Sequence, residues 1–313
     1  MTDSPTLPPE IVAVIPSYNR AATVGRAVRS VLEQTRPAEE VLVVDDGSTD
    51  DTPEVLADFG DTIRVLRTEN AGAAVARNRG VAATAAGWIA FLDSDDLWLP
   101  DHLARIAAAI TATEGRARVY FDDTVRPADG GGEASLFALA DLRLDGAHEI
   151  VDDATGWVLR PRQPSMLQSS VFARSAWEDV GGLWPVLRSR HDTHLFLRLG
   201  IGGSMCAVAG IGCRMTDDDT SGNRQMDAMG TRSRRYWEHT VHLYTDVIDR
   251  HGRQLADDQR TVLEARLARG HLALARQDLP RHPVAGTRHL VRALATHPPT
   301  AFGPVRRRLG GRP

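Results

Sequence analysis

Acidic residues cluster directly after an apolar run of this chain, at a spacing that suits metal binding. The segment F-L-D-S-D-D places Asp93, Asp95 and Asp96 within four residues, just past the run Trp88–Leu92. Carboxylates this close repel one another unless a cation or hydrogen bonds offset their charge, and a hard divalent metal with oxygen ligands does so. The pattern predicts a Mg²⁺ or Mn²⁺ site that can also bridge a diphosphate. An acidic turn with a helix cap at Asp95 or Asp96 is the alternative interpretation.

A second acidic cluster, in V-V-D-D-G-S-T-D, also follows a short apolar run. A carboxylate at Asp45 or Asp46 can accept a hydrogen bond from a base imide or from a ribose hydroxyl. Alternatively, the cluster forms an Asx-type turn that leads into a capped helix.

Any phosphate bound by this protein must be held by arginine, backbone N–H groups or a metal, because the sequence contains no lysine. Arg77 is the candidate, since its planar guanidinium suits bidentate phosphate contact. Arg79 is the better candidate for a solvated surface arginine. Tyr18 either stacks on a base or covers the edge of the core.

The elements that position these residues alternate between strand and helix through the first 123 residues. Apolar runs predict strands at 11–15, 41–44, 63–66, 88–92 and 119–121, and helical periodicity predicts helices at 22–34, 52–59, 73–85 and 100–112. This alternation predicts a doubly wound, mostly parallel α/β sheet flanked by helices. Such sheets bind ligands beyond the carboxyl ends of their strands, where both acidic clusters lie.

The rest of the chain is less regular. A helix is predicted from His191 to Leu199, and two or three helices between Arg232 and His297 form a C-terminal helical extension. The end of the chain, Arg306 to Arg312, is basic, and we expect at most weak attraction to anionic membranes from it. Three tryptophans in the second half either stack on sugars or pack in the core: Trp157, Trp177 and Trp184.

Composition excludes several classes of protein. The formal net charge is −4 and the pI is about 6.3, which argues against a nucleic-acid binder. No apolar run is long enough for a transmembrane segment, and the first residues do not form a secretory signal. Cys206 and Cys213 lack CxxC spacing, which argues against a zinc site or disulfide framework and fits a reducing cytoplasm. The absence of GxGxxG excludes a nicotinamide fingerprint.

Six segments, in this order and spacing, resemble the GT-A inverting glycosyltransferases of glycosyltransferase family 2. They are V-I-P-S-Y-N-R (14–20), V-V-D-D-G-S-T-D (43–50), N-A-G-A-A-V-A-R-N-R-G (70–80), F-L-D-S-D-D-L-W-L-P (91–100), V-G-G-L-W (180–184) and R-H-D-T-H-L-F-L-R-L (190–199). The resemblance covers roughly residues 11 to 223. It implies a GT-A-like fold with a nucleotide-sugar-binding half at 1–123, an acceptor-binding half of the same domain at 124–225, and a C-terminal helical region with a basic tail at 226–313.

The resemblance also implies roles for individual residues. Asp192 matches the general base that deprotonates the acceptor hydroxyl, with an N-cap of the helix at 191–199 as its alternative role, and Asp95 matches the metal ligand of the DxD motif. The implied nucleotide-sugar-binding residues are Pro16 and Tyr18 at the nucleobase, Asp46 at the uracil edge, Arg77 at the diphosphate, and Asp93 and Ser94 of the DxD motif. Two positions depart from the family: His191 stands where the family has Glu, and Thr216 where it often has His. The acids Asp217 to Asp219 are candidates to replace that histidine.

Together these features predict a metal-dependent glycosyltransferase of the inverting hexosyltransferase type. It would use Mn²⁺ or Mg²⁺ to move a sugar from a nucleotide diphosphate donor, a UDP-sugar, to an acceptor hydroxyl on a glycan, lipid-linked sugar, peptide or small natural product. A sugar nucleotidyltransferase and a nucleotide-sugar-binding module without turnover are the alternatives. We expect a cytoplasmic protein. The sequence leaves open a weak membrane association and a homodimer.

Overall fold

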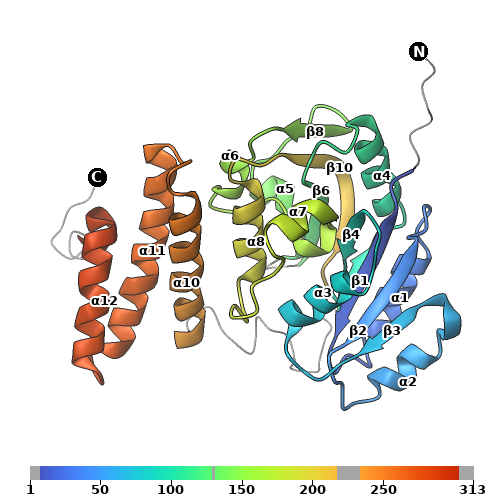
Figure 1. The fold of residues 1–313 in the computed structure, drawn as a ribbon, viewed down its shortest axis with the longest axis horizontal. Helices are drawn as coiled ribbons and strands as arrows, with labels where there is room; N and C mark the ends of the chain where they lie inside the picture. Colours follow the sequence, from blue (N-terminus) through green and yellow to red (C-terminus); the bar gives the residue numbers. More distant parts are fainter. Residues whose placement is uncertain (1–7, 129–130, 217–232, 303–313) are drawn as a thin grey trace. The chain divides into compact units, whose positions relative to one another are not determined.

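The computed structural model of the chain describes residues 8–128, 131–216 and 233–302, and the chain divides into two compact units (Figure 1). The first unit comprises Met1–Pro185 and Leu195–Arg224, and the second comprises Val186–His194 and Gln225–Pro313. The helix α8 (His191–Gly200) contributes its first residues to the second unit and the remainder to the first.

The elements of the first unit follow the predicted alternation up to residue 121, except for an unpredicted strand at 97–98. In chain order they are β1 (Ile11–Ser17), α1 (Val24–Leu32), β2 (Glu40–Asp45), α2 (Thr52–Ala57), the 3-10 turn Gly60–Thr62, β3 (Arg64–Arg67), α3 (Ala73–Ala82), β4 (Trp88–Phe91), β5 (Leu97–Trp98), α4 (His102–Ala112), β6 (Val119–Pro127), β7 (Glu133–Ser135), α5 (Leu136–Leu139), β8 (His148–Val151), α6 (Thr155–Val158), the 3-10 turn Leu167–Ser169, β9 (Ser170–Ala173), α7 (Arg174–Asp179) and β10 (Met205–Arg214).

The first four strands form a parallel sheet in the order β3-β2-β1-β4. Side chains alternate across it: Ile11, Ala13 and Ile15 pack into a core cluster with the apolar faces of α1 and α4. The opposite face receives α3, which approaches β1 so closely that a Cβ added at Gly80 would lie 2.4 Å from Cγ1 of Val14. Glycine at this position therefore lets α3, and Arg77 on it, lie against the sheet.

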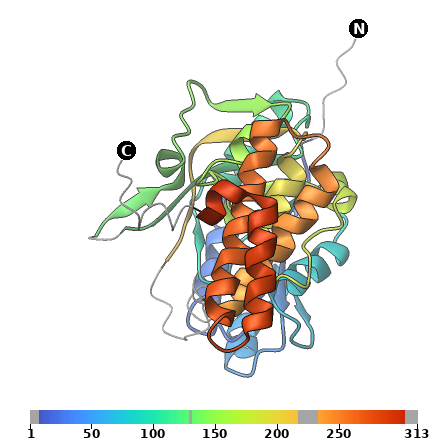
Figure 2. The same cartoon turned by 90° about the vertical axis from the view of Figure 1, so that its left-hand side faces the viewer.

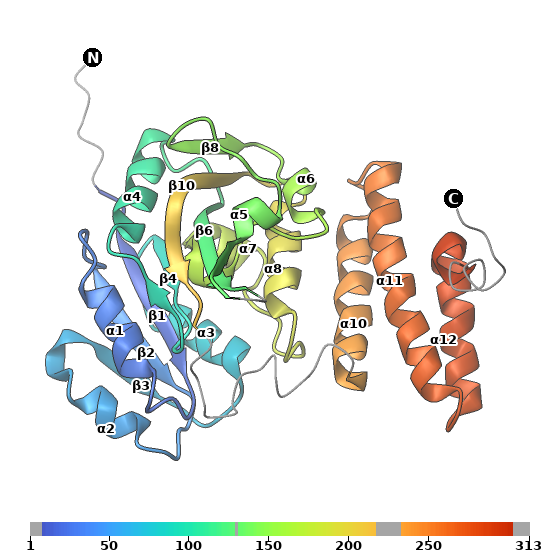
Figure 3. The same ribbon diagram turned by 180° about the vertical axis from the view of Figure 1, so that it is seen from behind.

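The second half of the sheet is mixed. Strand β9 pairs antiparallel with both β4 and β6, and β10 runs antiparallel to β5 and β8. Strand β10 also runs parallel to β6, beside which it lies in Figure 3. Register shifts in β10 at Val208/Ile211 and Ile211/Cys213 bend this strand. The result is a curled sheet flanked by helices, and the predicted fold class is confirmed.

Two of the three tryptophans noted in the second half belong to the core. Trp177 is 4% exposed and packs against Phe91 and Phe172, and Trp157 is 8% exposed with its ring edge-on to Phe121. Aromatic packing in the core therefore accounts for both. Trp184 is half-buried.

The second unit is built on three long helices that run side by side (Figure 2). They are α10 (Arg234–His251), α11 (Asp257–Asp278) and α12 (Pro283–Thr296), and α11 packs against both of the others. Among the described residues, no helix combines the length and the apolar character needed to cross a membrane.

A buried histidine pair gives the second unit a predicted pH dependence. The Nδ1 atoms of His271 and His289 lie 3.0 Å apart, which requires one protonated and one bare nitrogen. Burial lowers the pKa of His271 from 6.5 to about 4. The unfolded state therefore binds more protons than the folded state between these pH values, and stability falls as the pH decreases from about 6.5 toward 4.

We expect the second unit to lose about 2 kcal/mol of stability between pH 7.5 and pH 5. Thermal unfolding followed by circular dichroism at the two pH values measures this loss. The variant His271→Phe keeps a ring of similar shape without the proton site, so its transition should change less with pH. Equal pH dependence in the variant and the original chain would exclude His271 as the cause.

Candidate active site

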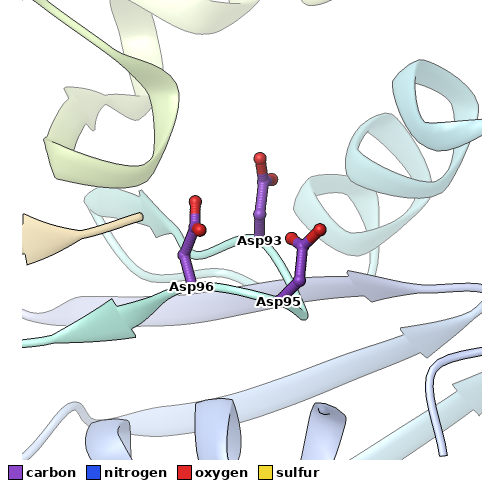
Figure 4. A group of neighbouring side chains, drawn as sticks. All are labelled: Asp93, Asp95 and Asp96. Carbon is purple, nitrogen blue, oxygen red and sulfur yellow. The ribbon is translucent and has the colours of Figure 1, made fainter. Parts of the chain in front are cut away.

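Three carboxylates gather in the turn that follows β4 at its carboxyl end. The turn is closed by a hydrogen bond from the backbone N–H of Asp96 to the carbonyl oxygen of Asp93, 3.0 Å long. Asp93, Asp95 and Asp96 can each direct an oxygen to a common point, with those oxygens within 4.8 Å of one another. Figure 4 shows the three side chains rising from the same side of the turn. Because carboxylate oxygens are the preferred ligands of Mg²⁺ and Mn²⁺, the residues present fit such an ion.

Arginines from three elements surround this turn and offset its negative charge. Arg77 of α3 is 4% exposed and forms an ion pair with Asp93. Arg20, just after β1, lies 3.6 Å from a carboxylate oxygen of Asp95, and Arg26 of α1 lies 3.5 Å from the Asp95 carbonyl oxygen. Fixed guanidinium groups beside an oxygen-rich cluster suit a ligand that carries both phosphate charge and a metal.

Asp96 is more deeply engaged than its two neighbours. It is 3% exposed, and its carboxylate accepts hydrogen bonds from Nε2 of Gln168 at 3.1 Å and from the backbone N–H of Thr216 at 3.2 Å. The side chains of Asp93 and Asp95 are 32% and 18% exposed. Asp93 and Asp95 are therefore the carboxylates open to a ligand, and Asp96 ties the turn to the distant segments that hold it.

Thr216, at the position where the family resemblance often has histidine, lies beside the carboxylate turn. Its hydroxyl donates to the Asp95 carbonyl oxygen at 2.5 Å and accepts from the Arg26 guanidinium at 2.8 Å. Thr216 thus links α1 to the turn and holds the backbone that presents Asp95. The candidate replacements Asp217 to Asp219 lie outside the described residues.

Asp46, predicted at the uracil edge, is 2% exposed and is engaged by the backbone before α3. Its carboxylate accepts hydrogen bonds from the N–H groups of Ala71, at 3.0 and 3.1 Å, and of Gly72, at 2.7 Å, and Arg79 lies 3.6 Å away. This arrangement fixes the loop that leads into α3. Arg79 is thus an ion-pair partner of Asp46 and not only a solvated arginine. A contact between Asp46 and a base stays a prediction.

The other predicted nucleotide-binding residues lie at the same edge of the sheet. Pro16 is buried in β1, Tyr18 is 39% exposed just after it, and Ser94 is 6% exposed in the carboxylate turn. The loop that carries Tyr18 is joined to the loop after β2, because Asn19 accepts a hydrogen bond from the Thr49 N–H at 2.8 Å. The carboxyl ends of β1, β2 and β4 therefore place these residues at one edge of the sheet.

Another set of buried polar groups joins β6 to α4. Asp122 of β6 is fully buried, and one of its carboxylate oxygens lies 2.8 Å from Nδ1 of His102 and 3.0 Å from Arg105. Burial raises the pKa of Asp122.

Burial raises the pKa of the Cys213 thiol, and the nearby carboxylates of Asp96 and Asp122 raise it further, so this cysteine stays neutral. Both cysteines are buried free thiols.

Asp192, the predicted general base, belongs to the second unit. It lies in the first turn of α8, one residue after His191, where this helix begins. Its carboxylate accepts the N–H of Thr193 at 2.7 Å and is half-buried. The residues around it are anchored on α10: Arg190 donates to the Tyr244 hydroxyl at 3.0 Å, and Nε2 of His194 lies 2.8 Å from Asp246. Helix α10 therefore fixes the start of α8.

Several residues of the site are not predicted by the sequence. The sequence predicts Asp96 as part of the acidic cluster, but not its burial or its hydrogen bonds with Gln168 and Thr216. Arg20 ends the segment V-I-P-S-Y-N-R, so its place in that motif is the available signal. Arg26 and Gln168 carry no motif signal, because their roles depend on which segments meet in the fold.

Comparisons with known proteins agree with this arrangement. Residues 12–138 match the sequence model described as Glycosyl transferase family 2. The chain is 38% identical over 189 residues to the succinoglycan biosynthesis protein ExoO of Rhizobium meliloti, an alignment that covers 58% of this chain and 48% of ExoO. The resemblance predicted from the motifs is confirmed. The chain spans about half the length of the curated relatives that it matches first.

Solved structures share the fold at low sequence identity. S. aureus TarS 1–349 in complex with UDP-GlcNAc is 15% identical with a TM-score of 0.63, over 96% of this chain and 92% of that one. The mannosyltransferase PcManGT from Pyrobaculum calidifontis, in complex with GDP-Man and Mn²⁺, is 21% identical with a TM-score of 0.56, over 97% of this chain and 81% of that one. At these identities the likeness establishes the fold alone.

Proposed function

Because the chain resembles glycosyltransferase family 2 through residues 12–138, we propose that it transfers a sugar from a nucleotide diphosphate donor, a UDP-sugar, to an acceptor hydroxyl. The observation that carries this proposal is the oxygen-rich turn Asp93–Asp96, surrounded by arginines at the carboxyl ends of the parallel strands. Ligands of doubly wound sheets bind at that edge. The comparison structures with UDP-GlcNAc and GDP-Man support a nucleotide sugar as the donor.

In this proposal, Asp93 and Asp95 would hold a Mn²⁺ or Mg²⁺ ion, and Asp96 would contribute through its place in the same turn. When bound, such an ion supplies a positive charge that stabilises the diphosphate leaving group. Arg77 faces the same turn and stabilises the remaining phosphate charge through its guanidinium. Tyr18 stacks on the nucleobase with its exposed ring, and Pro16 and Ser94 line the donor site.

Asp192 acts as the general base. Its carboxylate takes the proton of the acceptor hydroxyl while that oxygen attacks the anomeric carbon of the donor sugar. The bond from this carbon to the diphosphate oxygen breaks, and its electron pair leaves with the nucleoside diphosphate. A single displacement of this kind inverts the anomeric configuration and needs no covalent enzyme intermediate.

We assign residues 1–123 to donor binding, 124–225 to the acceptor half, and 226–313 to the C-terminal helical region. One finding supports a wider role for the last segment. The first residues of α8, with Asp192, group with the C-terminal helices and are anchored on α10. In this proposal α10 therefore positions the general base as well as completing the fold.

Asp46→Ala should weaken nucleotide binding by at least about tenfold, to the same extent with and without Mn²⁺. The change removes a buried acceptor of the Ala71 and Gly72 N–H groups, each of which costs about 1–3 kcal/mol when left unsatisfied. Calorimetric titration with UDP measures the effect, and thermal unfolding reports the loss of stability. If binding of inorganic pyrophosphate falls equally, the base contact assigned to Asp46 is wrong.

Thermal unfolding in the presence of nucleotide sugars tests the donor. The chain would be heated with UDP-, GDP-, CDP- and dTDP-sugars, each with Mn²⁺, against Mn²⁺ alone. A ligand at a hundred times its Kd stabilises the folded state by about 2.7 kcal/mol, so a true donor gives a clear shift. We expect the largest shift with a UDP-sugar. No shift beyond that of Mn²⁺ with any nucleotide sugar would contradict the proposed function.

A further inference from the structure

Basic residues are concentrated in the last part of the chain, although the whole chain has a formal net charge of −4. From residue 265 to the end the sequence contains ten arginines and a single acid, Asp278. Asp278 is 1% exposed and is ion-paired with Arg234 of α10, so its charge is already balanced. This part of the chain therefore presents a positive charge that no exposed acid of its own offsets.

Most of these arginines project into solvent from α11, α12 and the turn between them. Among the described residues, five of the six are exposed and one is half-buried; the six are Arg266, Arg269, Arg276, Arg281, Arg288 and Arg292. The outer side of α12, with Arg281, Arg288 and Arg292, is called the basic face below. A positive face on a negatively charged chain indicates a binding surface for an anionic partner.

The outer side of α12 also exposes apolar side chains. Val284, Arg288, Val291 and Ala295 follow one another at helical spacing and are all exposed, with Val284 at 76% and Val291 at 58%. Gly286 and Ala293, on the opposite side of the same helix, are buried. The helix therefore packs through its small residues and leaves valines among arginines on its free side. Phe302, six residues beyond the helix, is 54% exposed.

We propose that this basic face of α12 binds the surface of membranes that contain anionic phospholipids. Arginines attract anionic headgroups, and exposed valines can enter the boundary between headgroups and acyl chains, as in helices that lie on a membrane surface. A nucleic acid would also attract the arginines, but it offers no apolar layer for Val284 and Val291. The exposed valines therefore favour the lipid surface. This inference does not depend on the proposed catalytic function.

The attraction is peripheral and salt-sensitive. One arginine close to an anionic surface contributes about 1 kcal/mol, which corresponds to about fivefold in affinity. Neutralising three of them should therefore weaken binding by roughly a hundredfold. The attraction falls off within about 10 Å at 0.1 M salt, so high salt should release the protein.

Vesicle flotation of the full chain tests this proposal. Vesicles of phosphatidylcholine alone would be compared with vesicles that contain phosphatidylglycerol. The first variant carries Arg281→Gln, Arg288→Gln and Arg292→Gln, and its matched control carries Arg126→Gln, Arg143→Gln and Arg162→Gln, exposed arginines of the first unit. A third variant, with Val284→Gln and Val291→Gln, removes the apolar contacts and keeps good helix formers. Circular dichroism checks that each variant is folded.

We expect the original chain to bind only vesicles that contain phosphatidylglycerol and to be released at high salt. The vesicle affinity of the first variant should be lower by roughly a hundredfold, and its control should keep the affinity of the original chain. The valine variant should bind at least about fivefold more weakly. All variants keep the arginines near the C-terminus, so unchanged binding of the first variant would assign the attraction to another surface and overturn the proposal. Absence of vesicle binding, or tighter binding to duplex DNA or RNA at the same salt, would also overturn it.

Discussion

Asp192→Asn should reduce the rate of sugar transfer by at least about a hundredfold and leave donor binding close to that of the original chain. Asparagine keeps the size of the side chain and an oxygen that can accept the Thr193 N–H, so the first turn of α8 should survive. The contacts of Arg190 and His194 with α10 do not involve Asp192 and should also survive. The substitution removes the negative charge that takes the proton from the acceptor hydroxyl.

Transfer would be followed with a confirmed acceptor, and donor affinity would be measured by calorimetry on the same preparations. Asp249→Asn is a matched control, because Asp249 is an exposed acid of α10 in the same unit. It should transfer sugar at the rate of the original chain. Transfer by Asp192→Asn at a near-original rate would show that the base lies elsewhere and that the roles assigned to the second half of the chain are wrong.

Asp95→Asn should remove most of the nucleotide binding that depends on metal. Asp95 is one of the two carboxylates of the turn that remain open to a ligand. Its backbone carbonyl is held by Thr216, and this contact is independent of the side chain, so the turn should keep its course. Replacing a carboxylate by an amide leaves a weaker, uncharged oxygen ligand for a hard cation. We expect a loss of at least about tenfold in affinity for UDP with Mn²⁺, and little change without it.

Calorimetric titration of UDP, with Mn²⁺ and with a chelator, measures both quantities. Asp58→Asn replaces an exposed acid at the end of α2 and controls for the change in net charge. Mn²⁺-dependent affinity that is unchanged in Asp95→Asn would exclude Asp95 as a metal ligand.

The parallel half of the fold could be predicted from the sequence because its signals are local. The buried strands are short apolar runs, and α1 and α4 place their apolar residues on one face. The resulting topology brings the ends of β1, β2 and β4 to one edge, so the amino-acid pattern alone was enough to place the clusters at Asp45 and Asp93 together. Hydrogen bonds join the loops after β1 and β2, and Arg20 after β1 lies 3.6 Å from Asp95 in the turn after β4.

The remaining features depend on contacts between distant segments. Thr216 lies about 120 residues beyond Asp95 in the sequence, and nothing in its local pattern indicates that it holds this turn. The sequence could not distinguish an Asp46 carboxylate that accepts hydrogen bonds from the loop before α3 from one that binds a nucleobase, because the same motif fits both. Likewise, the hydrogen bond from Arg190 to Tyr244 joins residues that are 54 apart in the sequence. The antiparallel strands of the second half lack the regular alternation that identified the first half.

Release of UDP from a UDP-sugar is the measurement that tests the central claim most directly. The donor that gives the largest thermal stabilisation would be incubated with the chain, Mn²⁺ and a confirmed acceptor, and UDP would be quantified over time for the original chain and for Asp95→Asn. The account predicts UDP release that needs Mn²⁺, stops on addition of a chelator and is lost in Asp95→Asn. A donor that binds but releases no UDP, or release that neither the chelator nor the substitution affects, would contradict metal-dependent glycosyl transfer at this turn.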